Sequence, residues 1–240
     1  MEKYFDSGHF GTSVASIDLD LDPTTYEVLI GAVHRDRWRL TGAVFAYKID
    51  KEAKYKLLFN LTSVGVPGGD QMGEQFGYQI VVADFNADGK EDVAISAPTW
   101  SKLDSAATAN FGRVYTFMQK SGDGEMGELE PSGAINGSKA GGHFGWVMES
   151  PGDVDKDGFP DLIVSAPFYE TDGGRGTVCF ISFVSGCRLF ELILGLRVQW
   201  LRRRIALGSV ANINSRSKSV VRQFIVFHLG HDWNKRRGGE

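Results

Sequence analysis

Apolar residues in this chain occur in short runs that are separated by turn residues. Two such runs, Tyr78–Ala83 and Val93–Ser96, flank one acidic segment. A later run, Gly112–Phe117, resembles Gly42–Tyr47 and Gly176–Ile181 in its mixture of glycine, β-branched and aromatic residues. Short runs of this composition, bounded by Gly, Pro, Asn and Asp, predict β-strands.

A fourth strand is predicted at Tyr55–Asn60, so each unit of the pattern contains four short strands. The chain contains 30 glycines and shows no helical periodicity of its apolar residues. Glycine is unfavourable in helix interiors and marks turns. We therefore predict an all-β fold.

The strand pattern repeats along the chain. A Phe-Gly pair occurs at Phe76–Gly77 and again 68 residues later at Phe144–Gly145, and a degenerate copy begins 66 residues earlier at Phe10–Gly11. Each of the two well-formed copies continues into an acidic loop, an apolar run and an Ala-Pro pair. Repetition at a long fixed period is typical of propellers, solenoids and arrays.

The number of strands in each repeat favours a propeller. Four short strands make one propeller blade, and propellers close with about four to eight blades. Three blades cannot close a ring, so we predict a partial β-propeller, an open arc that is an incomplete piece of a larger propeller. The predicted blades are residues 8–66, 67–134 and 135–186, with approximate boundaries.

Charge and motif content both change near Cys187. Residues 1–186 carry a net charge of −12, whereas residues 187–240 carry +8. The second segment has no Phe-Gly pair and no acidic loop, but it has basic clusters at Arg202–Arg204 and Lys235–Arg237. We predict that residues 187–240 are a non-homologous basic tail, disordered or non-native. Its arginines lack the interleaved aromatic residues of a nucleic-acid module, so no nucleic-acid partner is expected.

Targeting and anchoring segments are not evident in the sequence. Residues 1–6 lead directly into the first repeat without the apolar core of a signal peptide. The most apolar window, Leu189–Leu201, is interrupted by Glu191 and Arg197. This window is too short and too charged to cross a membrane, so no transmembrane helix is predicted in this chain.

Two cysteines and two sequons bear on the compartment. Cys179 and Cys187 permit one disulfide, although a free, buried Cys179 fits the sequence equally well. Two sites, Asn60 and Asn136, match the acceptor pattern for N-glycosylation. They weakly favour a secreted or luminal setting.

The second and third repeats each carry a loop with oxygen-bearing residues at alternate positions. One loop begins at Asp84 with Gly89 at its sixth position, and the other begins at Asp153 with Gly158 there. Alternate residues of a tightly curled loop turn their oxygens inward, and hard oxygen ligands select Ca²⁺ or Mg²⁺. The predicted calcium ligands are Asp84, Asn86, Asp88, the Lys90 carbonyl and Asp92 in one loop, and Asp153, Asp155, Asp157, the Phe159 carbonyl and Asp161 in the other.

These loops differ from an EF-hand, which needs Glu at position 12 and flanking helices. Position 12 is Ile95 in one loop and Val164 in the other, both inside apolar runs. The ligand set therefore closes at position 9, with Asp92 or Asp161. Acidic turn residues are common without a metal, but two loops in register favour binding. The Asp153 loop has one more carboxylate and is expected to bind more tightly.

The corresponding loop of the first repeat is degenerate. Its position 6 is Pro23 instead of glycine and its position 9 is Tyr26, so Glu27 reaches the site only if one residue has been inserted. We expect weak or no metal binding there. The acidic residues at positions 1, 3 and 5 are Asp18, Asp20 and Asp22.

No catalytic motif is apparent, and we expect no enzymatic activity. His9 and His143 each precede a Phe-Gly pair and are interpreted as turn residues. A nucleophile elbow, a phosphate loop and a paired-histidine metal motif are all lacking. The phenylalanines of the pairs, Phe10, Phe76 and Phe144, are expected to pack between neighbouring sheets.

Phe-Gly, the acidic loop and Ala-Pro together resemble FG-GAP repeats, and residues 8–186 resemble the amino-terminal β-propeller of integrin α subunits. The resemblance is closest over Gly73–Pro98 and Gly142–Phe168, which look like later, calcium-carrying blades of a seven-bladed ring. It implies a fragment of a cell adhesion receptor on the extracellular side of the plasma membrane. Such a receptor pairs with an integrin β subunit and binds matrix or cell-surface ligands, and its calcium ions brace the blades.

Two alternatives to an adhesion receptor also fit the sequence. FG-GAP repeats also occur in glycosylphosphatidylinositol-specific phospholipase D, a secreted enzyme in which they accompany a separate catalytic domain. A soluble calcium-binding scaffold is the third interpretation. Sequence upstream would separate the first two, because further blades favour the integrin and a zinc-binding catalytic domain favours the phospholipase.

Overall fold

The computed structural model describes residues 8–20, 22, 25–34, 41–52, 54–102, 109–120, 127–171, 174–184 and 188–192. Within these ranges the chain forms twelve β-strands in three four-stranded antiparallel sheets. The predictions of an all-β fold and of three four-stranded blades are confirmed. This part of the chain contains no helix that is long and apolar enough to span a membrane.

Chain order and spatial order agree within every sheet. The first sheet contains β1 (Phe10–Ile17), β2 (Tyr26–Ala32), β3 (Ala43–Ile49) and β4 (Tyr55–Leu61). The second contains β5 (Ile80–Ala83), β6 (Asp92–Ala97), β7 (Arg113–Gln119) and β8 (Leu129–Asn136). The third contains β9 (Met148–Gly152), β10 (Asp161–Thr171), β11 (Gly174–Val184) and β12 (Arg188–Leu192).

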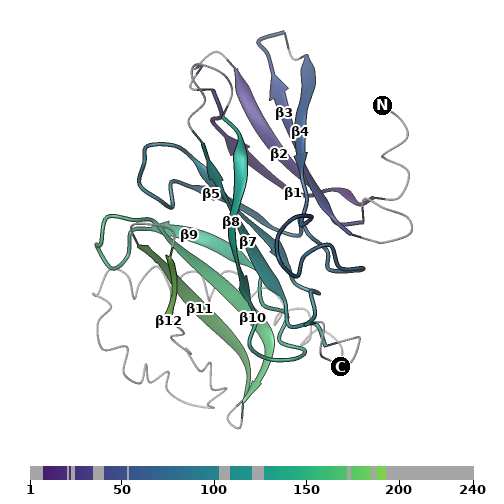
Figure 1. Cartoon of the computed structure of the whole chain (residues 1–240), viewed down its shortest axis with the longest axis vertical. Helices are drawn as coiled ribbons and strands as arrows, with labels where there is room; N and C mark the ends of the chain where they lie inside the picture. Colours follow the sequence, from purple (N-terminus) through teal and green to yellow (C-terminus); the bar gives the residue numbers. More distant parts are fainter. Residues whose placement is uncertain are drawn as a thin grey trace, which may run out of the picture.

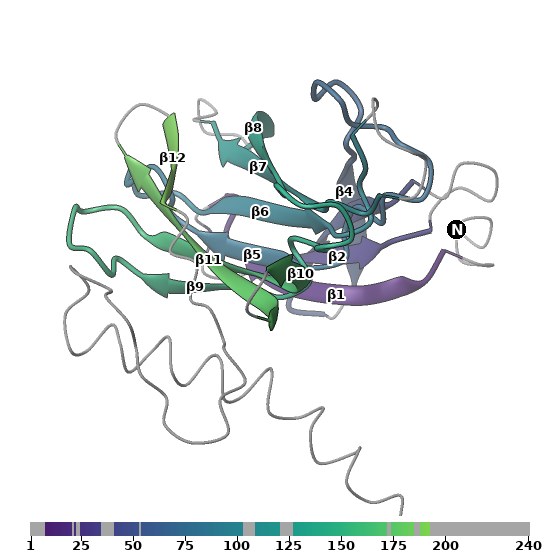
Figure 2. The ribbon, with the colours of Figure 1, turned by 90° about the horizontal axis from the view of Figure 1, so that it is seen from below.

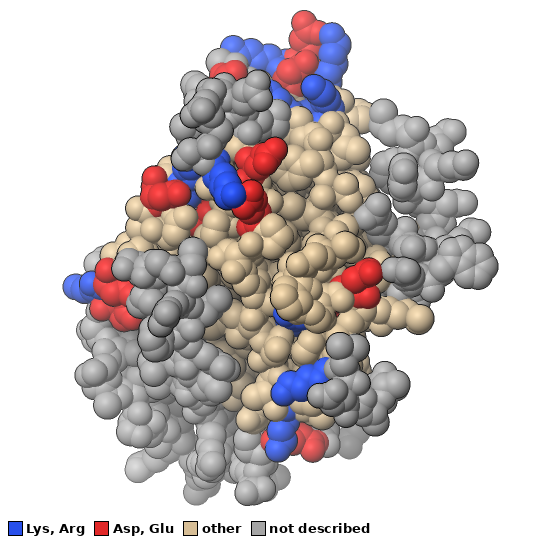
Figure 3. All heavy atoms as spheres, in the orientation of Figure 1, with Lys and Arg blue, Asp and Glu red and all other residues tan. Residues whose placement is uncertain are grey.

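The three sheets follow one another as an open arc (Figure 1). Their first strands lie at a common edge, where β1 contacts β5 and β5 contacts β9 (Figure 2). Strands at such an edge are those nearest the axis of a propeller. On the face shown in Figure 3, small groups of charged side chains are separated by uncharged surface.

The central sheet is buried on both faces because it lies between the other two. In β7, Tyr115 and Phe117 belong to the apolar cluster shared with the first sheet, whereas Val114 belongs to the cluster shared with the third. Successive side chains of a strand point to opposite faces, so one strand contributes to two cores. This arrangement explains why β7 carries apolar side chains on both of its faces.

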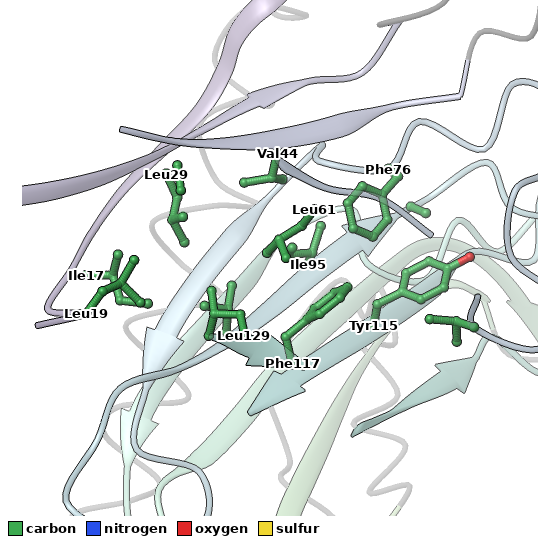
Figure 4. Close-up of a cluster of buried hydrophobic side chains, with 14 of the residues drawn as sticks. Ile17, Leu19, Leu29, Val44, Leu61, Phe76, Ile95, Tyr115, Phe117 and Leu129 are labelled. Atoms are coloured by element: carbon green, nitrogen blue, oxygen red, sulfur yellow. The ribbon is translucent and has the colours of Figure 1, made fainter. Parts of the chain in front are cut away.

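Side chains from both sheets fill the core between the first and second blades (Figure 4). Phe76 belongs to this core and is fully buried. Its ring meets Tyr115 edge-on at a centroid distance of 5.2 Å and Phe117 at 6.1 Å. The labelled members are Ile17, Leu19, Leu29, Val44 and Leu61 of the first blade, and Phe76, Ile95, Tyr115, Phe117 and Leu129 of the second.

Phe-Gly pairs pack against the preceding blade. A Cβ atom on Gly42 would lie 1.6 Å from the Phe76 carbonyl oxygen, and one on Gly112 would lie 2.1 Å from the Phe144 carbonyl oxygen. Glycine is therefore required where the third strand meets the next blade. Phe76 and Phe144 are buried between sheets as predicted. For Phe10 the prediction is wrong, because this side chain is 36% exposed.

The third sheet continues past the boundary at residue 186 that the sequence suggested. β12 pairs with β11 in antiparallel register, so Arg188–Leu192 completes the third sheet instead of belonging to a separate tail. The change of charge near Cys187 does not reveal this, because backbone pairing and not side-chain charge defines a strand. Residues 193–240, the rest of the predicted tail, lie outside the described residues, as does Cys187.

Candidate metal loops

The two predicted calcium loops connect the first and second strands of their blades. One runs from β5 to β6 and the other from β9 to β10. Asp92 and Asp161, at position 9, are the first residues of β6 and β10 and are completely buried. The last side-chain ligand of each set is therefore fixed by the sheet, whereas the earlier positions depend on the loop backbone.

Both loops have left-handed backbone at the same two positions. Gly89 and Gly158, at position 6, have φ angles of 86° and 98°. Ala87 and Lys156, at position 4, have φ angles of 55° and 68°. The glycine signal predicts position 6, because glycine adopts positive φ without strain. Position 4 could not be predicted, since alanine and lysine do not indicate this conformation.

The carboxylate at position 1 closes each loop. Asp84 accepts hydrogen bonds from the backbone N–H groups at positions 5 and 6, at 3.0 and 2.8 Å. Asp153 accepts the equivalent pair at 3.2 and 3.0 Å. Two loops that differ in sequence therefore share one hydrogen-bonding pattern at position 1.

Carboxylate oxygens converge in the loop of the third blade. One oxygen from each of Asp153, Asp155 and Asp161 lies within 4.8 Å of the others. Asp161 Oδ2 accepts a hydrogen bond from the Val154 N–H at 2.7 Å, whereas Asp161 Oδ1 is buried without a hydrogen-bond partner. A buried, unsatisfied carboxylate oxygen is costly. These residues fit a divalent cation bound by oxygen ligands. Asp157, which was also predicted as a ligand, is not part of this converging group.

The loop of the second blade is curled in the same way but less convergent. Among the described residues, its carboxylates do not gather within the same 4.8 Å limit. Asp92 accepts backbone hydrogen bonds from Gln119 at 2.9 Å and from Asn86 at 3.3 Å. The Asn86 side chain donates to Asp88 at 3.1 Å. The position-9 carboxylate is therefore better satisfied by protein groups than its counterpart in the third blade.

Burial raises the pKa of both position-9 carboxyls. The pKa of Asp161 is raised to about 7 by burial and by the other carboxylates of its loop, against the hydrogen bond from Val154. Burial likewise raises the pKa of Asp92 to about 6. A cation near these groups would favour their charged forms and lower both pKa values.

A lysine from β3, Lys48, reaches the acidic loop of the first blade, which the sequence pattern did not predict. Asp18, Asp20 and Glu27 each place one oxygen within 4.8 Å of the others. Glu27 is buried and accepts a hydrogen bond from the Leu19 N–H at 3.3 Å, so it does reach the site. The ammonium of Lys48 forms an ion pair with Asp20 and lies 4.0 Å from Glu27 Oε1.

The histidines before the Phe-Gly pairs occupy a shared turn. His9 and His143 have φ angles of 49° and 51°, and Gln75 at the equivalent place has 60°. Since a glutamine adopts the same backbone, the position is defined by the turn and not by imidazole chemistry. This observation agrees with their interpretation as turn residues.

Comparison with known proteins relates the chain to one repeat family. The FG-GAP repeat family model matches residues 76–117 and 149–179. The chain is 37% identical to integrin alpha-IIb from Homo sapiens over 179 residues, which is 73% of this chain and 16% of that protein. It is 31% identical to integrin alpha-5 from Xenopus laevis over 166 residues, which is 68% of this chain and 14% of that protein. The matches therefore span only about a sixth of the relatives' length.

Proposed function

Because the chain carries FG-GAP repeats and is similar to integrin α subunits over about 70% of its length, we propose that it is a propeller fragment of an integrin-α-like cell adhesion receptor. The observation that carries this proposal is the pairing of three consecutive four-stranded blades with the integrin similarity. The relatives described above favour this function over the phospholipase and scaffold alternatives.

The receptor would act on the extracellular side of the plasma membrane. We propose that the full-length protein pairs with an integrin β subunit and binds a matrix or cell-surface ligand. Asn60 and Asn136 are both exposed, on β4 and β8, the fourth strands of their blades. Their exposure is compatible with glycosylation in that compartment. Sequencing the transcript on both sides of this chain tests whether it is part of such a receptor. Further blades would support this assignment, and an adjoining zinc-binding catalytic domain would contradict it.

Calcium is the proposed cation of the loops at 84–92 and 153–161. Their donors are carboxylate, amide and carbonyl oxygens, which Ca²⁺ prefers. The ion would hold two strands of one blade together and would do no chemistry. Extracellular calcium modules have Kd values of roughly 10⁻⁴–10⁻³ M, so the sites would fill outside the cell.

Calorimetric titration of the whole chain tests the calcium proposal. Asp155→Ala removes one of the three converging oxygens of the third loop, so we expect the loss of one binding event. The matched change Asp22→Ala, in the degenerate first loop, should alter the titration little. Equal losses from both variants, or no calcium binding by the parent chain, would contradict the assignment.

A further inference from the structure

We propose that the ammonium group of Lys48 replaces the divalent cation in the first blade, so that this blade holds its acidic loop closed without metal. The inference extends the proposed calcium binding of the other two loops. It assigns a role to a side chain that lies 28 residues along the chain from its partner Asp20.

The position of Lys48 among the acidic groups supports this role. Its ammonium pairs with Asp20 and lies 4.0 Å from Glu27 Oε1, and both carboxylates belong to the converging group of the first loop. The exposed fractions of the three side chains are 25% for Lys48, 15% for Asp20 and 2% for Glu27. The pair Lys54–Glu52 is different, because it is 74% and 71% exposed and reaches no such group. Exposed pairs of that kind contribute little to stability.

Strand register places Lys48 where the other blades have no cationic side chain. Lys48 lies directly opposite Glu27 in the pairing of β3 with β2. In the second blade, Val93 pairs with Phe117, so Met118 follows at the corresponding place. In the third blade, Ile181 pairs with Leu162 and is followed by Ser182. Thus only the blade with the degenerate loop carries a lysine at this position.

The degenerate loop is also less suited to a metal. Gly89 and Gly158 have positive φ at position 6, and proline is restricted to φ near −65°, so a sequence with Pro23 in place of this glycine is less favourable for a metal loop. A divalent ion at Asp20 and Glu27 would have to displace the tethered ammonium of Lys48. The loss of the glycine and the presence of the lysine therefore both disfavour the binding of a divalent ion in the first blade.

Lys48→Met, which copies the residue of the second blade, tests the substitution of metal by lysine. In a chelator, we expect this variant to melt below the parent, because Asp20 and Glu27 lose the nearby ammonium group. Added calcium should raise its melting temperature more than that of the parent, and calorimetry should detect one additional binding event. Lys48→Arg keeps the charge and should resemble the parent, as should the exposed control Lys54→Met.

Asp20→Asn provides a second test that does not depend on the folding of Lys48→Met. The parent and Asp20→Asn should bind the same number of calcium ions; loss of one ion would overturn the proposal. An unchanged calcium response in Lys48→Met would also overturn it. If the parent binds no calcium at all, the proposed calcium function fails separately. In that case a double-mutant cycle in chelator decides: non-additive effects of Lys48→Met and Asp20→Asn support the ion pair, and additive effects contradict it.

Discussion

The Oδ1 atom of Asp161 is buried without a hydrogen-bond partner, a situation that a nearby cation would relieve. This carboxyl is buried at the end of a β-strand, and other carboxylates lie beside it. The protein satisfies one of its oxygens with the Val154 N–H and leaves the other without a hydrogen bond. Its neighbours and its burial both oppose ionisation, and a bound cation would favour the charged form.

The raised pKa of Asp161, at about 7, predicts an unusual dependence of stability on pH. Without calcium, the folded chain keeps a proton on Asp161 that the unfolded chain releases near pH 4. Between these pH values the folded state binds more protons, so this residue's stabilising contribution is present below about pH 4 and lost as the pH rises through about 7. In saturating calcium the carboxylate is ionised in the folded state, and this loss should disappear.

Urea unfolding of the parent and of Asp161→Asn, each with chelator and with calcium, measures this contribution. The asparagine does not titrate, so the difference between the two proteins isolates Asp161 from other acidic groups. We expect that, in chelator, the parent loses stability relative to Asp161→Asn from about pH 4 to 7. A difference that is independent of pH would show that Asp161 does not titrate as described.

At the scale of strands and loops, close contact between blades depends on small residues. Gly112, at the start of the third strand of its blade, approaches the Phe144 backbone so closely that a Cβ would lie 2.1 Å from the carbonyl oxygen. Its φ angle is 79°. Two effects, positive φ and steric overlap, therefore oppose any substitution there.

A matched pair of glycine variants separates these two effects. Gly112→Ala and Gly141→Ala both place alanine at a positive φ, of 79° and 72°, but only Gly112 has backbone atoms in the way, since Gly141 faces open space. We expect Gly112→Ala to lower the unfolding free energy by about 1–3 kcal/mol more than Gly141→Ala, the usual cost of overpacking. Similar losses, measured by urea denaturation, would show that the blades can move apart without cost.

The repeat period of the sequence and the residue types of its apolar runs predicted most of the strands, because the blades repeat and each repeat contains its own turns. The pattern could not predict β12, whose sequence lacks the repeat motifs and which is defined by pairing with β11. It also could not place Glu27 or Lys48 in the first loop. An inserted residue shifts Glu27 from its expected position, and Lys48 arrives from another strand. Comparing Lys48 with Met118 across the repeats is the signal that could have found it.

Across the whole molecule, the first blade has an exposed aromatic face. The Phe10 ring contacts Phe45 and Tyr47 of β3. The Phe76 ring contacts two aromatic residues of β7 in the second blade in the same way. In the second blade, the first sheet covers the surface that Phe76 and these β7 residues form. In the first blade, by contrast, Phe10, Tyr55 and Leu57 are 36%, 60% and 49% exposed. Exposed apolar patches and strand edges promote association.

We therefore expect the isolated chain to self-associate through the first blade. Sedimentation velocity over a range of concentrations should show oligomers or aggregates of the parent. A double change, Phe10→Ser with Tyr55→Ser, should shift the population toward monomer, whereas Met72→Ser, at a separate residue that is 74% exposed, should not. A parent that stays monomeric at all concentrations would contradict this prediction.

Hydrogen exchange of the backbone amides, with and without calcium, tests the central claim most directly. Calcium should slow exchange in the loops at 84–92 and 153–161, where backbone N–H groups bind the carboxylates that would hold the ion. Exchange at 18–27 should stay unchanged, because Lys48 already pairs with Asp20 there. Equal slowing in all three loops, or no slowing in any loop, would contradict this account.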